Sequence, residues 1–319
     1  MSLIAAIPPW EVGKFGSCVH HLCSGIVQKD RLVRPRNTVP LWREGKTMKV
    51  SFVVMAYKQE QFIERAVASA FAQDYSDLEI VLTDDCSPDS TFEIMSRMAA
   101  HYKGPHKVVL NRNPRNLGLI GHVNSLFSLV TSDWLIYNAG DDISEPSRSR
   151  IIAQTSLREN PYYIYSNATD IDPAGAPLRT QKNRTRPSVL NEKPLPELAR
   201  AMSHALGASS AWHRDIFSRF GPISETNLFE DQVLMFRARL LGKVSYIEER
   251  LLQYRRSIGL SFQTKGDEKQ RFLRDIAILS QRRRDALAVA PERTDIISSI
   301  DHKLRKRQLA LRETGANRG

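Results

Sequence analysis

The sequence predicts an α/β protein with a mostly parallel central sheet flanked by helices. Short apolar runs typical of buried strands alternate with segments that carry apolar residues at helical spacing. The connections between these segments are short, as in parallel sheets built from strand–helix–strand units. Acidic residues follow several of the apolar runs, at the strand ends where open α/β sheets bind their ligands.

The first half of the chain alternates strands and helices in regular order. Strands are predicted at 49–57, 78–83, 107–110 and 134–137, and helices at 61–72, 89–102, 121–130 and 147–159. Because parallel crossovers are right-handed, the carboxyl ends of these strands should meet at one edge of the sheet. Tyr57, Asp84-Asp85 and Asp141-Asp142 are therefore expected to lie together at that edge.

The second half of the chain is less regular. Its apolar patterns predict strands at 162–165, 244–247 and 251–256, and helices at 195–203, 229–241, 267–288 and 294–311. Residues 172–196 are rich in Pro, Arg, Lys, Thr and Asn, and they predict a long mobile loop. We expect an N-terminal extension at 1–47, one domain at 48–262 and a C-terminal helical extension at 263–319.

The composition indicates a globular protein with a basic balance. The 319 residues are 41% hydrophobic and 25% charged, with a net charge of +11 and no apolar run of transmembrane length. Much of the positive charge lies at Arg282–Arg284 and Lys303–Arg307, which we interpret as solvated helix faces. Three cysteines and a first segment unlike a signal peptide predict a reducing, cytoplasmic location.

Asp141 and Asp142 follow the predicted strand at 134–137. Two adjacent carboxylates repel each other unless a cation or hydrogen-bond donors share them. A divalent metal that carries phosphates is one reason to build such a pair. The alternative is an exposed turn in which an aspartate caps the next helix.

Two other acidic segments have both a functional and a structural interpretation. Asp85 could accept hydrogen bonds from a nucleobase or a ribose hydroxyl, or it could simply form the turn before the next helix. Glu230-Asp231 opens a predicted helix, where an acid can be a general base or a plain N-terminal residue. The dinucleotide, Walker, nucleophile-elbow and zinc-protease motifs are absent from the sequence.

Five short motifs occur in sequence within residues 48–262. They are Val-Ser-Phe-Val-Val-Met-Ala-Tyr, Leu-Thr-Asp-Asp-Cys-Ser, Asn-Leu-Gly, Ala-Gly-Asp-Asp and Phe-Glu-Asp-Gln. Their order resembles that of the family-two inverting glycosyltransferases with the GT-A fold. The resemblance implies a GT-A, Rossmann-like domain. It departs from the family pattern at Val123, where an Arg is common, and at Ser257, where a His is common.

The resemblance also implies roles for the matching residues. Asp142 would bind Mg²⁺ or Mn²⁺ at the donor diphosphate, and Asp231 would be the general base. Asp85 would bind the nucleobase, and Asp141 the ribose or the donor sugar. The other implied contacts are Ala56, Tyr57, Asn116, Gly118 and Arg255 for the donor, and Gly207, Trp212 and Glu230 for the acceptor.

The implied function is metal-dependent, inverting transfer of a hexosyl group from a nucleotide-sugar, expected to be a UDP-sugar. The acceptor would be a glycan or lipid-linked hydroxyl in polysaccharide synthesis, and no nucleic acid is expected as a partner. The basic C-terminal helices could approach the inner face of a membrane. The favoured interpretation is that these helices pack against the rest of the protein and expose a solvated basic face. A sugar nucleotidyltransferase and a non-catalytic nucleotide- or nucleic-acid-binding protein remain the alternatives.

Overall fold

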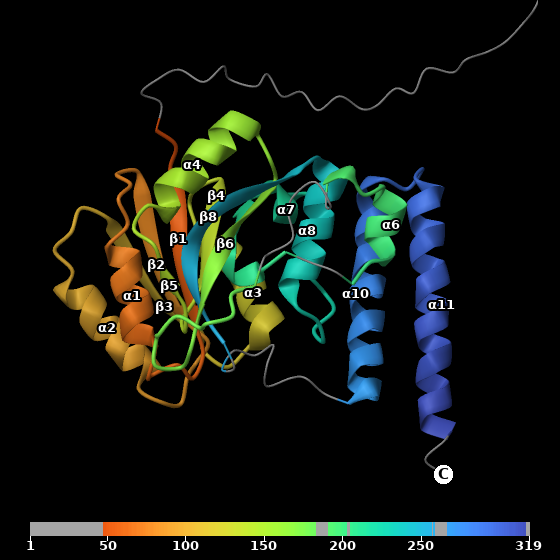
Figure 1. Cartoon of the computed structure of the whole chain (residues 1–319), viewed down its shortest axis with the longest axis horizontal. Helices are drawn as coiled ribbons and strands as arrows, with labels where there is room; N and C mark the ends of the chain where they lie inside the picture. Colours follow the sequence, from red (N-terminus) through yellow and green to blue (C-terminus); the bar gives the residue numbers. More distant parts are fainter. Residues whose placement is uncertain (1–46, 183–190, 203–204, 257, 259–266, 317–319) are drawn as a thin grey trace, which may run out of the picture. The chain divides into compact units, whose positions relative to one another are not determined.

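A computed structural model describes residues 47–182, 191–202, 205–256, 258 and 267–316, all within one compact unit, Leu41–Gly319. The described residues form an α/β fold around an eight-stranded sheet with the order β3-β2-β1-β4-β7-β6-β8-β5. Figure 1 shows helices on both sides of this sheet and two long helices at one end. The predicted fold class is therefore confirmed.

Four neighbouring strands are parallel, as the alternating pattern predicts. They are β1 (Val50–Ala56), β2 (Leu78–Asp84), β3 (Lys107–Arg112) and β4 (Trp134–Ala139). The helices that connect them are α1 (Ile63–Phe71), α2 (Thr91–His101) and α3 (Gly118–Leu129). Every residue of β1 and β2 is buried, because helices cover both faces of this part of the sheet.

The core lies in two layers, one on each face of the sheet. Val53 belongs to the layer that also contains side chains of α3 and α8, whereas Phe52 belongs to the layer beneath α1 and α4. This alternation follows from the two-residue period of a strand. Each fully buried Val, Leu, Ile or Phe side chain contributes roughly 1.5–3 kcal/mol relative to exposure. Side chains of β1 and β4 belong to both layers, and this packing holds the ends of the two strands in position.

The other four strands complete the sheet. They are β5 (Ile143–Ser144), β6 (Tyr163–Ile171), β7 (Ser210–His213) and β8 (Val244–Arg255). Strand β7 is antiparallel to both β4 and β6, and neither β5 nor β7 was predicted from the sequence. The prediction of two strands at 244–247 and 251–256 is wrong, because β8 is continuous. Exposed Glu248–Arg250 interrupt the apolar pattern, but a bulge opposite Ser166–Asn167 lets the pairing with β6 resume.

The described helices of the second half are α4 (Arg148–Glu159), α6 (Leu195–Arg200), η1 (Gly207–Ser209), α7 (Asp215–Ser218), α8 (Glu230–Leu241), α10 (Glu268–Val289) and α11 (Thr294–Ala316). Phe236 of α8, Leu279 of α10 and Ile300 of α11 share a small core. The predicted boundary between 262 and 263 stays a prediction, but α10 packs directly against α8. Of the predicted loop at 172–196, residues 183–190 lie outside the described ranges.

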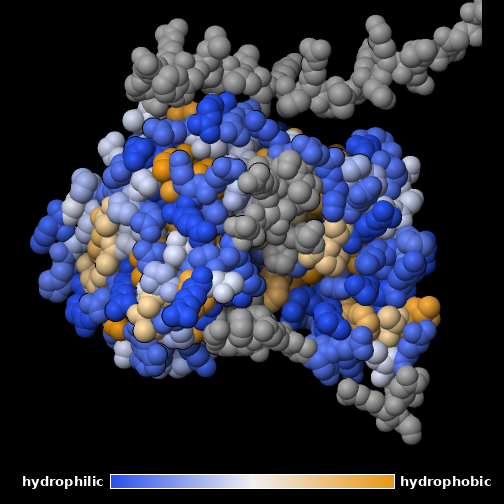
Figure 2. Space-filling view, in the orientation of Figure 1, coloured by the Kyte–Doolittle hydropathy of each residue, from blue (hydrophilic) through white to orange (hydrophobic). Residues whose placement is uncertain are grey.

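The surface of the C-terminal helices is mainly hydrophilic (Figure 2). None of the helices in the described ranges combines the length and the apolar character that crossing a membrane requires. The interpretation of Arg282–Arg284 as a solvated face is wrong for Arg282, which is fully buried. Its guanidinium donates to the carbonyls of Ala199 and Ala201 at 3.0 and 2.7 Å, because the last carbonyls of α6 have no partner within that helix.

Candidate active site

A cavity of about 690 Å³ lies beyond the carboxyl ends of β1, β2 and β4. Its walls also include η1, the first turn of α8 and one face of α10. A volume of this size is within the range of small-molecule sites. The cavity brings together all predicted site residues except two: Ala56, Tyr57, Asp85, Asn116, Gly118, Asp141, Asp142, Gly207, Glu230 and Asp231.

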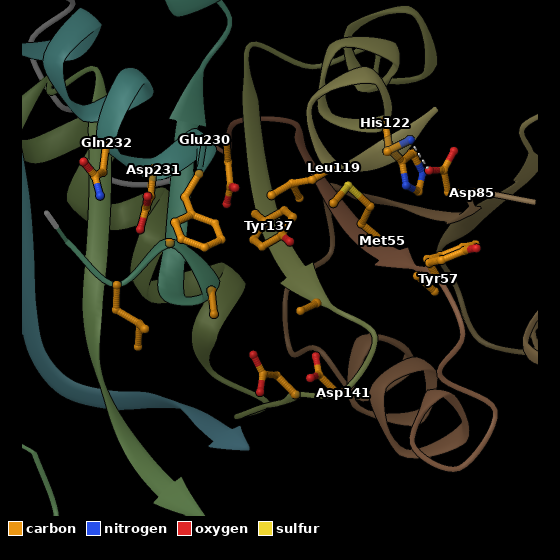
Figure 3. A pocket seen from close by; sticks show the side chains of 18 of the residues that line it. Met55, Tyr57, Asp85, Leu119, His122, Tyr137, Asp141, Glu230, Asp231 and Gln232 are labelled. Atoms are coloured by element: carbon orange, nitrogen blue, oxygen red, sulfur yellow. Dashed lines mark hydrogen bonds between the residues drawn. The ribbon is translucent and has the colours of Figure 1, made fainter. Parts of the chain in front are cut away.

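The residues of the cavity fall into two groups. In Figure 3, Tyr57 and Asp85 lie on one side of Tyr137, whereas Glu230 and Asp231 lie on the other. The first group comes from the ends of β1 and β2, and the second from the start of α8. Segments far apart in the sequence therefore face one another across β4, and the two groups could contact different parts of a ligand.

The turns after β1 and β2 hold each other in place. Lys58 and Cys86 have positive φ angles of 55° and 59°, a conformation that costs a non-glycine residue about 1–2 kcal/mol. The Lys58 amide donates to Ser87 Oγ at 2.9 Å, and the Gln59 amide donates to Thr91 Oγ1 at 2.8 Å. These bonds stabilise the turn that presents Tyr57 to the cavity.

Asp85 organises the loop before α3. Its Oδ1 accepts from Asn113 Nδ2 at 2.7 Å and the Leu117 amide at 2.9 Å, and its Oδ2 accepts from the Gly118 amide at 2.9 Å. Asp85 therefore has a structural role, but it holds the loop before α3 and not the turn before the next helix, α2. Each carboxylate oxygen has two lone pairs, so Oδ2 retains capacity for a ligand donor. Binding of a nucleobase by Asp85 stays a prediction.

His122 lines the same part of the cavity but does not carry a positive charge at neutral pH. Its Nε2 is hydrogen-bonded to Thr83 Oγ1 at 2.9 Å. Burial lowers the pKa of His122 to about 4, although the neighbouring Asp85 opposes this effect. His122 therefore does not supply the positive charge that the resemblance leads us to expect from an arginine at position 123. Ser257, the other departure, lies outside the described residues.

Asp141 and Asp142 form a buried acidic pair at the end of β4. Burial raises the pKa of Asp142 well above its usual value, and the adjacent charge of Asp141 raises it further. The Arg255 amide donates to Asp142 Oδ1 at 2.8 Å, which lowers that pKa. Burial is also the main cause of the raised pKa of Asp141. A cation between these two carboxylates would relieve both effects.

Arg148, a residue that the sequence analysis did not single out, lies fully buried next to this pair. Its guanidinium donates to Ser144 Oγ at 2.8 Å, the Tyr137 carbonyl at 2.7 Å and the Ala208 carbonyl at 3.1 Å. Burial lowers its pKa to about 9, while the charge of Asp142 raises it. Arg148 therefore ties β4 to η1 beneath the acidic pair. Nothing in its helical sequence context distinguishes it from a surface arginine.

Arg255 and Trp212 are the two predicted site residues that do not line the cavity. Arg255 Nε donates to the Asp141 carbonyl at 2.9 Å, so its guanidinium supports the acidic turn. Trp212 is fully buried, stacks on Tyr137 with ring centroids 5.3 Å apart, and donates from Nε1 to Ser210 Oγ at 2.6 Å. The direct substrate contacts predicted for these two residues have no support from their positions.

The carboxylates of Glu230 and Asp231 are placed by the first turn of α8. Burial raises the pKa of Glu230 to about 8, and the negative charge of Asp231 contributes to the same shift. Glu230 therefore holds a proton at neutral pH. The positive end of the α8 dipole favours the remaining negative charge. This asymmetry makes Asp231 the better candidate for a proton acceptor.

Gly207 of η1 lies directly against Asp231. A Cβ atom at position 207 would be 2.9 Å from Asp231 Cβ and 3.1 Å from Glu230 Oε1. We expect Gly207→Ala to displace Asp231 and to lower kcat by about tenfold to a hundredfold, because small misplacements of a catalytic group are costly. Steady-state transfer kinetics measure this effect, and the circular dichroism spectrum of Gly207→Ala is the control that the variant is folded. Wild-type kcat in Gly207→Ala would contradict the expectation.

The raised pKa of Glu230 predicts a pH-dependent stability. The folded state holds this proton between the unfolded value near 4.5 and the folded value near 8, so stability falls as pH rises through that window. At pH 9 we expect Glu230→Gln to be more stable than the wild type by roughly 5 kcal/mol, and at pH 4 the difference should vanish. Urea denaturation at both pH values measures it. If the stability difference between Glu230→Gln and the wild type were the same at pH 4 and pH 9, the raised pKa assigned to Glu230 would be refuted.

One face of α10 forms a cavity wall that the sequence analysis missed. Arg271, Arg274, Asp275 and Ile278 all line the cavity. Their spacing is that of one helical face, a signal present in the sequence. The predicted boundary at 262 assigned this helix to an extension, and its face was not considered with the site.

The acidic pair fits a metal ion that arrives with a substrate. Among the described residues there is no cluster of three or more His, Cys, Asp or Glu side chains able to hold a metal ion. Mg²⁺ usually binds through one or two carboxylates together with substrate phosphates and waters. Asp141 and Asp142 supply that number of oxygen ligands, and Asp142 Oδ1 is already engaged by the Arg255 amide.

Comparisons with known proteins point to one family. Residues 51–221, more than half of the chain, match the family model described as Glycosyl transferase family 2. The succinoglycan biosynthesis protein ExoO of Rhizobium meliloti is 28% identical over 204 residues, covering 63% of this chain and 55% of that protein. The chain spans between 35% and 65% of the length of three curated relatives.

Solved structures of low sequence identity share the fold. TarS 1–349 of S. aureus, solved with UDP-GlcNAc, superposes with a TM-score of 0.57 at 15% identity, covering 82% of this chain and 72% of that one. The mannosyltransferase PcManGT of Pyrobaculum calidifontis, solved with GDP-Man and Mn²⁺, gives 0.54 at 18% identity, covering 85% and 76%.

Proposed function

Because the chain belongs to glycosyl transferase family 2, we propose that its cavity transfers a sugar from a nucleotide-sugar donor to an acceptor hydroxyl. The observation that carries the proposal is the arrangement of two acidic groups around one cavity. Asp85, Asp141 and Asp142 end the parallel strands, while Asp231 enters from α8. The first group suits the donor and the second suits the acceptor.

The nucleotide would bind at the strand ends. Asp85 Oδ2 would accept the N–H of the base, and Tyr57 would lie against it at the turn after β1. Asn116 and Gly118 line the adjoining wall, and Ala56 ends β1 beneath them. A UDP-sugar is the expected donor, and the relatives solved with UDP-GlcNAc and GDP-Man make uracil and guanine the bases to compare.

Asp142 would be the principal ligand of a Mg²⁺ or Mn²⁺ ion at the donor diphosphate, and Asp141, next to it, would contact the ribose or the donor sugar. When bound, such an ion neutralises the charge that develops on the leaving diphosphate. Support comes from the buried acidic pair itself and from the Mn²⁺ in the PcManGT complex. Arg148 and the Arg255 amide would keep the two carboxylates in place.

Asp231 would remove the proton from the acceptor hydroxyl. The acceptor oxygen forms a bond to the anomeric carbon while the bond from that carbon to the diphosphate breaks, and the proton passes to Asp231. Because attack and departure occur on opposite faces of the sugar, the anomeric configuration inverts. Glu230, protonated at neutral pH, would donate a hydrogen bond to the sugar or the acceptor, and Gly207 would leave room beside it.

The acceptor would be a glycan or a lipid-linked glycan, a proposal that the similarity to ExoO supports. Contact with a membrane would go through α11, where Arg305, Lys306 and Arg312 are exposed. The apolar side chain of Leu309, which is 58% exposed, lies among these basic residues in the sequence. A cytoplasmic enzyme at the inner face of the membrane would fit this arrangement.

The alternatives have weaker support. A sugar nucleotidyltransferase needs a cationic phosphate loop near the first strand, and Lys58 does not line the cavity. Its amino group instead lies 5.3 Å from the centre of the Tyr57 ring. A nucleic-acid binder would need a groove with basic and aromatic residues interleaved. The described cavity is instead rich in carboxylates.

A donor screen tests the proposal. The full chain is incubated with UDP- and GDP-sugars in Mn²⁺ or in EDTA, and release of the nucleoside diphosphate is measured. Water can take the place of the acceptor hydroxyl, so donor hydrolysis would give a signal without an acceptor. We expect turnover of one donor class with Mn²⁺ and none with EDTA. Turnover that EDTA does not change would overturn metal dependence. Formation of a nucleoside triphosphate and a sugar 1-phosphate when pyrophosphate is added would favour a nucleotidyltransferase.

A further inference from the structure

The part of α10 that lines the cavity carries two arginines. Arg271, Arg274, Asp275 and Ile278 follow the i, i+3, i+4, i+7 spacing of one helical face. Ile278 anchors this face in the core that α8 shares. Since α10 packs against α8, the arginines lie on the wall that also presents Asp231.

Arg274 is the inner of the two arginines. It is partly buried, and its guanidinium lies 4.6 Å from the centre of the Phe229 ring. Phe229 caps α8 and directly precedes Glu230 and Asp231. A cation stacked on an aromatic face is held in position, and a guanidinium has five N–H donors, more than a single partner uses. Arg274 therefore lies beside Glu230 and Asp231, the residues assigned to the acceptor substrate.

Arg271 is one turn nearer the solvent. Its side chain is 67% exposed, and it is 3.6 Å from Glu268 in an ion pair on the helix surface. Such exposed pairs are weak and exchange readily. The third charged residue of the face, Asp275, is bound by Arg307 of α11 at 2.8 Å. Asp275 is also near the charges of Arg271 and Arg274, so it offsets part of the positive charge of this face.

We propose that Arg271 and Arg274 bind an anionic group of the acceptor, a phosphate or a carboxylate. This inference rests on the proposed function and narrows its substrate class to acidic sugars and sugar phosphates. A neutral acceptor would gain little from two guanidinium groups. An anionic acceptor would be repelled by the carboxylates of this cavity, and two guanidinium groups would offset that repulsion. Planar guanidinium groups bind phosphate and carboxylate through paired hydrogen bonds.

Arg271 and Arg274 lie on the α8 side of the cavity, so we do not assign them to binding of the donor diphosphate. Glu230 and Asp231 lie across Tyr137 from Asp85 in Figure 3. The donor diphosphate is assigned to the acidic pair at the end of β4. An anion held by Arg274 would lie beyond Asp231, where the acceptor hydroxyl must arrive.

Binding of small probes tests the proposal. The full chain is saturated with Mn²⁺ and the nucleoside diphosphate that it binds, and glucose 6-phosphate, glucuronic acid and methyl glucoside are titrated by calorimetry. The phosphate and carboxylate probes distinguish the two acceptor chemistries. The variants are Arg274→Gln and the double variant with Arg271→Gln. Lys269→Gln, which removes a charge from the same exposed end of α10 without lining the cavity, is the matched control.

We expect at least one anionic probe to bind more tightly than methyl glucoside. The double variant should weaken that binding about tenfold or more, as loss of charge-assisted hydrogen bonds implies, while Lys269→Gln should not. Unchanged probe binding in the double variant would overturn the proposal. Equal weakening of nucleoside diphosphate binding would also overturn it, by assigning the arginines to the donor. A wild type that binds no nucleoside diphosphate would instead refute the proposed function.

Discussion

Replacing Asp231 with asparagine is expected to lower kcat for sugar transfer by about 10²- to 10⁴-fold, the usual contribution of a general base. The amide preserves the shape of the side chain but cannot take the acceptor proton. Donor binding should be unchanged, because Asp231 lies on the α8 side of the cavity, away from Asp85 and the acidic pair. Single-turnover kinetics with the identified donor separate the two effects.

Glu230→Gln is the matched control for this prediction. Glu230 neighbours Asp231, is equally buried and also lines the cavity. Because its pKa is raised to about 8, it carries a proton at pH 7, and the neutral glutamine should imitate it. We expect a loss in kcat of less than tenfold. If Glu230→Gln lost more activity than Asp231→Asn, the roles of the two acids would be reversed.

Replacing Arg148 with methionine should have the largest effect on stability. The fully buried guanidinium donates to side chains and carbonyls of β4, β5 and η1, and it lies near the charge of Asp142. Its removal leaves buried acceptors without a donor and the acidic pair without a nearby cation. Removing one member of a buried charged set typically costs on the order of 3–5 kcal/mol. Urea denaturation measures the loss of unfolding free energy.

Arg150→Met is the control on the same helix. Arg150 pairs with Asp74 at 3.2 Å, and their side chains are 43% and 46% exposed. An exposed ion pair contributes about 0–1 kcal/mol. The two substitutions remove the same charge from the same element, so a difference between them reports burial. If Arg148→Met and Arg150→Met destabilised the protein equally, the role of buried Arg148 in supporting the acidic pair would be contradicted.

The sequence was sufficient for the parallel half of the fold because its signals are local. The apolar run Trp134–Tyr137 ends in acids, and the structure places those acids at the expected sheet edge. Strand β7 could not be found in this way. Ser210–His213 is too short to show alternation, and its pairing with β4 depends on residues distant in the chain.

Predicted site residues that follow a strand or open a helix line the cavity, whereas two from late segments do not. Arg255 carries the expected residue type, but its guanidinium is used by the Asp141 carbonyl. Trp212 is likewise a support beneath Tyr137. Which way such side chains point depends on tertiary packing, which no local pattern encodes. The arginines of α10 were missed for the related reason that the contact between α10 and α8 joins distant segments.

The metal site depends on the fewest groups, because it rests on Asp142 and its neighbour Asp141 at the end of β4. Asparagine at position 142 retains an oxygen that can accept from the Arg255 amide, so Asp142→Asn should fold. It lacks the charge that a divalent ion requires. The variant therefore separates a structural acidic turn from a metal ligand.

The most direct test is the thermal shift produced by UDP and GDP, each with Mn²⁺ and with EDTA, in the wild type and in Asp142→Asn. A ligand at a hundred times its Kd stabilises the native state by about 2.7 kcal/mol, which raises Tm by several degrees. We predict this rise for one nucleotide in the wild type with Mn²⁺, and its loss with EDTA or with Asp142→Asn. A Mn²⁺-dependent rise of the same size in Asp142→Asn would contradict the assignment of the donor site.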